Sequence, residues 1–151
     1  MGSTYCNLLY HAVFSTKNRQ RWISSELETR LFAFMGGTVR EKCEGVLLAA
    51  NGTEDHVHLL LGLHQTKSIA NVVRDVKSNS SRWIHQTFPD YADFEWQGGY
   101  GAFTVSVSQR EKVKRYLARQ KTHHGDVSFE TEFIILLDAH EIEYDKRYVF
   151  D

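Results

Sequence analysis

Two kinds of hydrophobic periodicity alternate along this chain, and their order constrains the fold more than any other feature of the sequence. Residues 5–14 are rich in aromatic and β-branched residues, as in a buried strand, and residues 56–63 read as the returning strand of a hairpin, whereas apolar residues recur at helical spacing in residues 25–43 and 68–84. The predicted segments follow the order strand, helix, hairpin, helix and strand. This is the split βαβ order of a ferredoxin-like α+β fold, which predicts an antiparallel sheet with helices packed on one face.

Local signals set the expected boundaries of these segments. Asn51-Gly52 predicts a tight turn inside the hairpin, between a short strand at residues 45–50 and the returning strand. Capping-box spacing marks two expected helix starts, Ser25 with Glu28 and Ser108 with Glu111. Further strands are expected at residues 94–96 and 103–107, around a glycine-rich loop. Two closing helices are additions to the ferredoxin-like order, one that begins near Ser108 and carries Gln120, and one at residues 129–140.

Length and composition favour one compact domain over two. The chain has 151 residues, of which 42% are hydrophobic and one is proline, so we expect residues 1–151 to form a single domain. Its two cysteines, Cys6 and Cys43, are too few for a disulfide framework and lack the paired spacing of a zinc site. Without a signal peptide or a membrane-spanning apolar run, the sequence predicts a cytoplasmic protein that does not enter a membrane.

A histidine pair in the second strand of the hairpin is the first candidate for chemistry. His56 and His58 are two residues apart in a strand, so both rings leave one face, while Val57, Leu59 and Leu61 enter the core. Two imidazoles so placed could share one divalent metal ion. Because roughly 0.4 such pairs are expected by chance in a chain of this composition, a solvated strand face is the alternative interpretation.

A tyrosine and a glutamine on the first closing helix form the second candidate. Tyr116 and Gln120 are four residues apart, so a phenol oxygen and an amide oxygen could address the same point. The alternative is an exposed helix position beside a half-buried ring. The two histidines and the amide oxygen together would fill only part of a metal ion's coordination shell. Coordination positions would then remain for oxygen atoms of the substrate. Such a site would align a phosphate for attack by the phenol, and the phosphotyrosine would keep the energy needed for rejoining.

Charge is distributed unevenly although the net charge is only −1. The helix around Tyr116 carries six basic residues opposed by Glu111, namely Arg110, Lys112, Lys114, Arg115, Arg119 and Lys121. The stretch after residue 125 is acidic instead, with Asp126, Glu130, Glu132, Asp138, Glu141, Glu143, Asp145 and Asp151. The basic helix would attract phosphate backbones, although a solvated helix face gives the same pattern.

Several aromatic residues could stack on unpaired bases. The candidates are Trp22, Trp96, Tyr100 and Phe103, near glycines that would let a nucleotide approach the backbone. Phe103 is expected to lie in the core, whereas for Tyr100 both stacking on a base and packing in the core remain possible. His123-His124 could contact phosphate or the metal, but the end of a helix also favours histidine for its dipole.

Taken in order, these motifs resemble one family, the single-tyrosine HUH transposases of the insertion-sequence 200/605 group, where HUH means histidine, hydrophobic residue, histidine. The resemblance extends over nearly the whole chain. It rests on residues 13–17, 55–60, 99–103, 113–120, 123–124, 129–133 and 143–145. Several motifs in one order are more specific than any single motif.

The resemblance implies a DNA transposase that cuts and rejoins single-stranded DNA. Tyr116 would take a 5′-phosphate, while His56, His58 and Gln120 would hold Mg²⁺ or Mn²⁺, with no organic cofactor. Family members recognise DNA hairpins near the ends of a mobile element, and they are homodimers that merge their sheets and can pair the tyrosine of one subunit with the histidines of the other. A prokaryotic source is implied. Candidate DNA contacts are Lys17, Arg74, Lys77, Tyr100, Arg115 and Arg119.

Two other functions remain open at this stage. A ferredoxin-like sheet with exposed aromatics could bind single-stranded nucleic acid without catalysis. A domesticated relative could process palindromes in its host genome by the same chemistry. The sequence leaves open the target hairpin, the preferred metal, whether one chain or two form the active site, and whether this copy is active.

Overall fold

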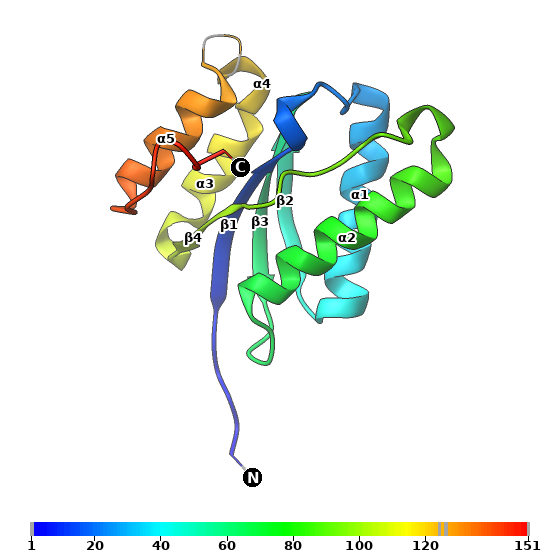
Figure 1. Cartoon of the computed structure of the whole chain (residues 1–151). Helices are drawn as coiled ribbons and strands as arrows, with labels where there is room; N and C mark the ends of the chain where they lie inside the picture. Colours follow the sequence, from blue (N-terminus) through cyan, green and yellow to red (C-terminus); the bar gives the residue numbers. More distant parts are fainter. Residues whose placement is uncertain (1, 124, 126, 151) are drawn as a thin grey trace.

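The computed structural model describes residues 2–123, 125 and 127–150 and contains one four-stranded antiparallel sheet (Figure 1). The strand order is β2-β3-β1-β4. The strands are β1 (Leu8–Ser15), β2 (Val46–Gly52), β3 (His56–Leu63) and β4 (Gly101–Val105). The helices are α1 (Ser25–Cys43), α2 (Ile69–Thr87), α3 (Arg110–Ala118), α4 (Gln120–His123) and α5 (Phe129–Ala139), with short 3₁₀ turns at Lys17–Arg19, Pro89–Tyr91 and Val107–Gln109. The predicted ferredoxin-like order is confirmed.

One face of the sheet packs against α1 and α2 and holds the larger core. Side chains alternate along a strand, so Val57, Leu59 and Leu61 of β3 enter this core together. Helix α2 contributes the predicted apolar stripe, including buried Val72 and Val76. Its first turn is capped by Ser68, whose side chain accepts a hydrogen bond from the Asn71 backbone N–H.

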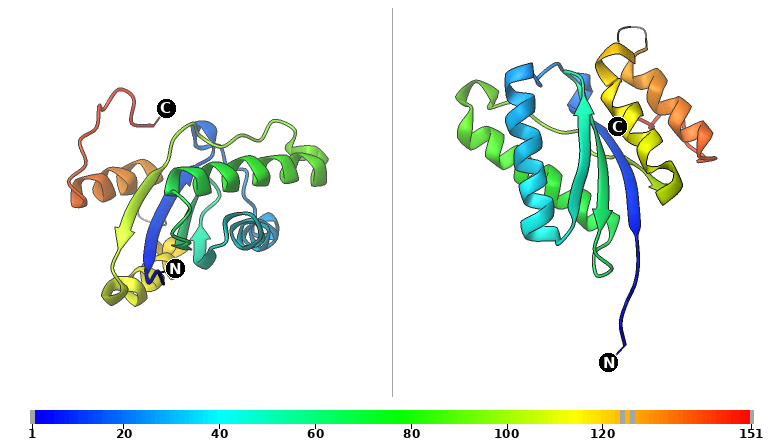
Figure 2. Two further views of the ribbon diagram at one scale, coloured as in Figure 1. Left: turned by 90° about the horizontal axis from the view of Figure 1, so that it is seen from below. Right: turned by 180° about the vertical axis from the view of Figure 1, so that it is seen from behind.

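The opposite face is also covered. Helices α1 and α2 lie on one side of the sheet, as predicted, while the closing helices α3, α4 and α5 lie on the other (Figure 2). Here Val13 of β1 and Phe103 of β4 pack against the α5 residues Phe129, Phe133 and Leu137. The central strands β1 and β3 are therefore buried on both faces, which gives polar side chains on the second face an enclosed environment.

Helix α1 runs from Ser25 to Cys43 as predicted, but one cap residue, one other helix start and one helix end were wrong by one or two residues. Ser24, not Ser25, caps α1 by accepting a hydrogen bond from the Leu27 backbone N–H at 3.1 Å. Helix α3 begins at Arg110 without a side-chain cap bond, because Ser108 lies inside the preceding 3₁₀ turn. It ends at Ala118, so Gln120 begins the separate helix α4.

The predicted hairpin turn and one predicted strand were also wrong. Asn51 and Gly52 are the last residues of β2, because they pair with His58 and Val57, and the connection is residues 53–55. Residues 94–96 form no strand in the described structure, since Trp96 alone makes an isolated bridge to Thr16. None of the described helices combines the length and the apolar character needed to cross a lipid bilayer.

Glycine substitutions provide a matched test of this part of the fold. A Cβ at Gly52 would overlap the carbonyl oxygen of His56 and the Cα of Val57. We therefore expect Gly52→Ala to lower the free energy of unfolding by about 1–3 kcal/mol. Gly37 lies in the middle of α1, and a Cβ added there would meet open space. Gly37→Ala should therefore raise the free energy of unfolding by about 0.5–1 kcal/mol. Urea unfolding measures both values, and equal effects would contradict the close approach at Gly52.

Candidate active site

The two histidines of β3 are buried on the face covered by the closing helices. His56 and His58 both have 0% exposure, so a solvated strand face is ruled out as the reason for this pair. Each ring directs its Nε2 atom toward the closing helices. His56 Nε2 lies 3.2 Å from Gln120 Oε1, and His58 Nε2 lies 2.9 Å from Oε1 of Glu132. Strand β3 thus presents two imidazole nitrogens to oxygen atoms from α4 and α5.

Glu132 is the group on which the cluster converges. Its carboxylate is 1% exposed and offers a ligand atom that lies, with those of His56 and His58, within a span of 4.8 Å. Its Oε1 faces the histidine nitrogens, at 2.9 Å from His58 and 3.5 Å from His56. Its Oε2 accepts a hydrogen bond from Gln120 Nε2 at 2.9 Å. Two imidazoles, a carboxylate and an amide oxygen are a donor set suited to a divalent ion.

Tyr116 reaches the same carboxylate from α3. Its hydroxyl donates a hydrogen bond to Oε2 of Glu132, the oxygen that also binds Gln120. Its ring meets the ring of His58 edge to face, with the centroids 5.8 Å apart. Burial and the hydrogen bond to Glu132 raise the pKa of the Tyr116 hydroxyl above its ordinary value. The phenol therefore keeps its proton near neutral pH in the metal-free protein.

A second layer of side chains orients both histidines. His56 Nδ1 lies 2.8 Å from Asp55 Oδ1, and His58 Nδ1 lies 2.8 Å from Nε2 of His11 on β1. Because each Nδ1 atom contacts one of these partners, the Nε2 atom of each ring points into the cluster. Such outer partners fix the tautomer and orientation of metal-binding histidines in proteins.

The pKa values of His11 and His56 move in opposite directions. Burial, together with the nearby His58 ring, lowers the pKa of His11 from 6.5 to about 3. Burial also opposes charge on His56, but the hydrogen bonds to Asp55 and Glu132 outweigh it and raise the pKa of His56 from 6.5 to about 9. His11 is thus neutral and His56 protonated in the metal-free protein near neutral pH.

These shifts predict a pH optimum for the stability of the metal-free protein. His56 keeps its proton up to about pH 9 only in the folded state, so its contribution is complete below pH 6.5 and is lost as the pH rises toward 9. The folded state excludes a proton from His11, so that contribution is lost as the pH falls from 6.5 toward 3. We expect the free energy of unfolding in urea, measured with chelator, to be greatest near pH 6.5. A rise in stability from there toward pH 9 would contradict this prediction.

The family follows from the comparison with known proteins. Residues 4–120 match the family model described as "Transposase IS200 like". The chain belongs to the IS200-like transposase family. The matched segment contains His56, His58, Tyr116 and Gln120, and it ends before α5, so Glu132 lies outside it. The matched segment thus supplies the histidine pair, the tyrosine and the glutamine of the cluster, while the carboxylate comes from α5, beyond the end of that segment.

Individual relatives agree with this assignment. The transposase of insertion sequence IS200 from Salmonella typhimurium is 28% identical over 128 residues, which cover 80% of this chain and 81% of that protein. The ISDra2 transposase TnpA of Deinococcus radiodurans is 26% identical over 126 residues, which cover 75% of this chain and 84% of that protein. A crystal structure of a putative transposase from the same species superposes with a TM-score of 0.63 at 27% identity, covering 80% of this chain and 96% of the other.

A second solved structure shares the fold. A REP-associated tyrosine transposase bound to a REP hairpin superposes with a TM-score of 0.62 at 13% identity. The alignment covers 84% of this chain and 74% of that one. Four antiparallel strands with helices on both sides are thus an architecture that this IS200-like transposase has in common with solved transposases.

Glu132 of the cluster and His11 of the layer that orients its histidines were not predicted from the sequence. Glu132 was counted only as part of an acidic stretch, yet it lies on the buried side of α5 with Phe129 and Phe133. A carboxylate on an apolar helical stripe was the available signal. His11 was read as part of a buried strand, and its alternation with Val13 toward the second face was the corresponding signal.

The candidate DNA contacts divide between two faces of the molecule. Arg74, Lys77 and Tyr100 line a groove of about 490 Å³ between α2 and residues 95–100, on the other side of the sheet from the cluster. Lys77 donates hydrogen bonds to the carbonyl oxygens of Gln97 and Gly99, and burial lowers its pKa to about 8. Tyr100 is 38% exposed. In this groove Lys77 holds the loop while Arg74 and Tyr100 are accessible.

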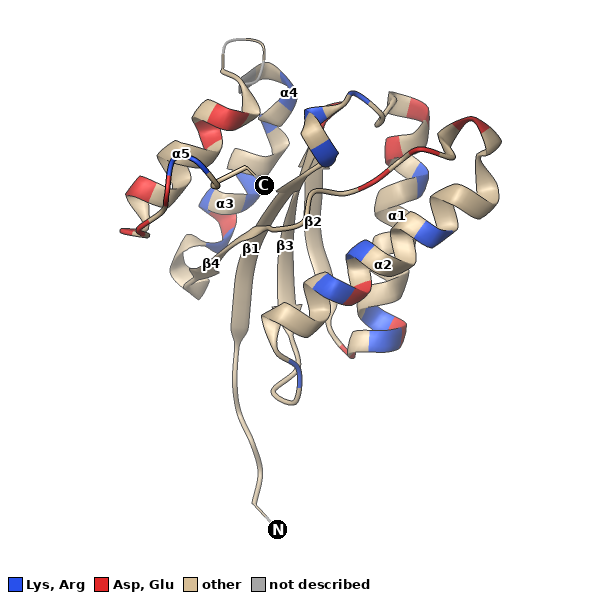
Figure 3. Cartoon of the chain, in the orientation of Figure 1, with Lys and Arg blue, Asp and Glu red and all other residues tan. Residues whose placement is uncertain are grey.

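The other candidates lie elsewhere on the surface. Lys17 forms an exposed ion pair with Glu95 at 2.9 Å. Arg115 in α3 and Arg119, which follows the end of α3, are exposed. Basic residues occur on α3 and acidic ones on α5 (Figure 3). Phe103 is buried at 3% exposure, as predicted. His124 and the side chain of His123, like Asp126 and Asp151, lie outside the described part of the chain.

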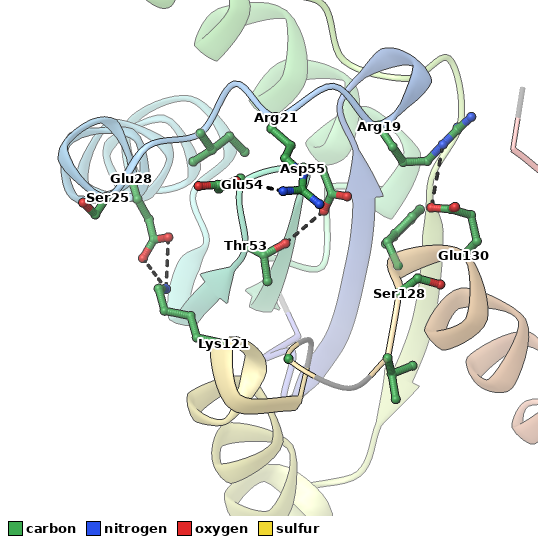
Figure 4. A pocket seen from close by; sticks show the side chains of 14 residues that line it. Arg19, Arg21, Ser25, Glu28, Thr53, Glu54, Asp55, Lys121, Ser128 and Glu130 are labelled. Atoms are coloured by element: carbon green, nitrogen blue, oxygen red, sulfur yellow. Dashed lines mark hydrogen bonds and ion pairs between the residues drawn. The ribbon is translucent and has the colours of Figure 1, made fainter.

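A cavity of about 650 Å³ lies beside the connection between β2 and β3, where α1 and the start of α5 meet it (Figure 4). Its basic side chains face acidic ones across the cavity. Lys121 Nζ lies 2.8 Å from Glu28 Oε1 and 2.8 Å from Asn51 Oδ1. Asn51 also donates a hydrogen bond to the carbonyl oxygen of Leu117. These contacts tie α3 and α4, and with them Tyr116 and Gln120, to the end of β2.

Proposed function

We propose that this transposase cuts and rejoins single-stranded DNA at hairpin-marked ends through a 5′-phosphotyrosine intermediate. The observation that carries this proposal is the convergence of His56, His58, Gln120 and Tyr116 on one buried carboxylate, Glu132. A nucleophile is thereby set beside a candidate metal site, as strand transfer requires. We further propose that residues 1–151 act as one transposase domain.

The donor atoms fit Mg²⁺ or Mn²⁺. Nε2 of His56 and of His58 would hold the ion together with Oε1 of Glu132 and Oε1 of Gln120. Oxygen donors suit these hard cations, and imidazole suits Mn²⁺. When bound, the ion supplies positive charge that polarises a phosphoryl oxygen and favours the ionised phenol. The protonated state of His56 in the metal-free protein implies that metal binding releases a proton.

The chain's own residues define the remaining steps. The Tyr116 oxygen attacks the phosphorus, so a phenol O–P bond forms while the bond to the 3′ oxygen of the preceding nucleotide breaks. Glu132 Oε2, which accepts the phenolic hydrogen bond, is placed to receive the proton. Transfer of this proton from Glu132 to the leaving 3′ oxygen gives a 3′-hydroxyl and restores the Glu132 carboxylate. Attack by a 3′-hydroxyl on the phosphotyrosine reverses these bond changes and rejoins DNA.

The geometry supports an active site formed within one chain. All five groups of the cluster belong to the same chain, although family resemblance still leads us to propose a homodimer. Mixing two inactive variants, Tyr116→Phe and His58→Ala, tests this arrangement. A site within one chain predicts no recovery of cleavage in the mixture, whereas exchange of tyrosines between subunits predicts partial recovery.

The decisive experiment looks for the covalent intermediate. Single strands with varied hairpins and flanking sequences are incubated with the protein and Mn²⁺ or Mg²⁺, then resolved under denaturing conditions. We expect a protein–DNA adduct that needs the metal and disappears with chelator. Binding without cleavage, unaffected by chelator, would instead support a non-catalytic nucleic-acid-binding protein.

A further inference from the structure

A cavity of about 510 Å³ lies between β4, α3 and the end of α5, on the same face of the sheet as the cluster. Its wall includes the side chains of Tyr116 and His11. The groove along α2 and the cavity beside the β2–β3 connection are lined by neither of these residues. This cavity therefore gives access to the tyrosine from outside the buried cluster.

Access from this side matters because the cluster itself is closed. His56, His58 and Gln120 each have 0% exposure, and Glu132 has 1%. Tyr116 is only partly buried, so its ring is the part of the site that borders accessible space. A DNA strand that brings a phosphate to the Tyr116 oxygen would consequently place an adjoining nucleotide against this cavity.

The lining has the chemistry of a nucleobase pocket. It combines apolar and aromatic side chains with polar ones, and the rings of two lining residues, Phe103 and His140, are stacked with centroids 4.2 Å apart. Thr104, Ser106 and Gln109 offer hydrogen-bonding groups, and Lys112 supplies a cation. The lining contains no carboxylate, whereas the cavity beside the β2–β3 connection has four acidic residues. Apolar walls with a few hydrogen-bonding groups typify small-ligand sites, and the absence of acidic groups suits a polyanion.

We infer that this cavity takes an unpaired nucleobase adjacent to the phosphate that Tyr116 attacks. The inference rests on the proposed function and specifies how the substrate strand is positioned for it. The base enters between the ring of Tyr116 and the Phe103–His140 pair, where apolar contact and stacking hold it. Lys112 lies at the cavity and contacts the strand's phosphate.

Binding of base-bearing and base-free strands tests the inference independently of catalysis. Short oligodeoxynucleotides of dT, dA and dC are compared with an abasic strand of equal length, which keeps sugar and phosphate alone, by fluorescence anisotropy with the full chain. We expect at least about tenfold tighter binding of one or more base-bearing strands, because stacking of a base commonly contributes that much. Strands that carry 5-iododeoxyuridine should crosslink within residues 103–116 or 136–140.

Cavity-filling variants localise the effect. Val113 of α3 and Val105 of β4 line the cavity and are partly exposed, so Val113→Phe and Val105→Phe narrow it from two independent elements. Val107→Phe is the matched control, because Val107 is 57% exposed and is not part of the lining. In both filling variants the ratio of the affinity for base-bearing strands to that for the abasic strand should fall to about one. The control should keep the ratio of the unchanged protein. Circular dichroism identifies any variant that fails to fold.

The outcomes separate this inference from the proposed function. Equal binding of abasic and base-bearing strands, or a preference that survives in both folded filling variants, overturns the nucleobase pocket. The adduct assay run on the same proteins decides the chemistry separately. A base preference that depends on the cavity, found without any adduct, would support a nucleobase pocket but overturn its position beside a phosphate that Tyr116 attacks.

Discussion

Replacing Tyr116 with phenylalanine is expected to abolish the covalent protein–DNA product, with a loss of at least about a thousandfold in its rate of formation. The phenol oxygen is the nucleophile of the proposed reaction, and the hydroxyl that meets Glu132 Oε2 belongs to this residue. The measurement is the yield of adduct over time on a denaturing gel with a cleavable hairpin-bearing strand and Mn²⁺.

The variant should otherwise stay intact. Glu132 Oε2 keeps its hydrogen bond from Gln120 Nε2, so the metal ligands should hold their positions and Mn²⁺ affinity should change by only a few-fold. Tyr148→Phe serves as the matched control, since Tyr148 is 60% exposed and far in sequence from the cluster. Persistence of the adduct in Tyr116→Phe, with the site of attachment mapped to another residue, would assign the nucleophile elsewhere.

The sequence predicted the sheet because its signals were local and consistent. Val57, Leu59 and Leu61 alternate with two histidines, and an apolar stripe at helical spacing marks α2, so the hydrophobic period agrees with the observed elements. The Asn51-Gly52 turn failed for a reason that is not local. Gly52 is needed where β2 approaches the His56 carbonyl, and that contact depends on strand pairing.

The candidate site was predicted less completely than the fold. His56, His58, Tyr116 and Gln120 stand in recognisable spacings, and the structure brings them together although Gln120 belongs to a separate helix. Glu132 could not be placed from its neighbours in sequence, because its role depends on how α5 docks on the sheet. Phe129 and Phe133 pack in the core on this face of the sheet, and Glu132 on the same buried side of α5 reaches His58.

The position of α5 outside the segment matched by the family model makes Glu132 the most informative residue to change. Its two oxygens have different partners: Oε1 faces the histidines, and Oε2 contacts Tyr116 and Gln120. The carboxylate could therefore act on the metal, on the phenol, or on both. Separate measurements of metal affinity and adduct formation distinguish these roles.

Glu132→Gln should weaken Mn²⁺ binding at least about a hundredfold, because even outer-shell partners of metal ligands typically contribute about 10–100-fold. Removal of the proton acceptor should slow adduct formation by about a further hundredfold at saturating metal. Isothermal titration gives the affinity, and gel-resolved adduct gives the rate. Glu130→Gln, two residues earlier on the same helix and paired with Arg19 at the surface, is the control that should leave both unchanged. If Mn²⁺ affinity is unaltered and adduct formation is slow, Glu132 acts only as the proton acceptor of the phenol. If both the affinity and the rate are unaltered, Glu132 has no role in the active site.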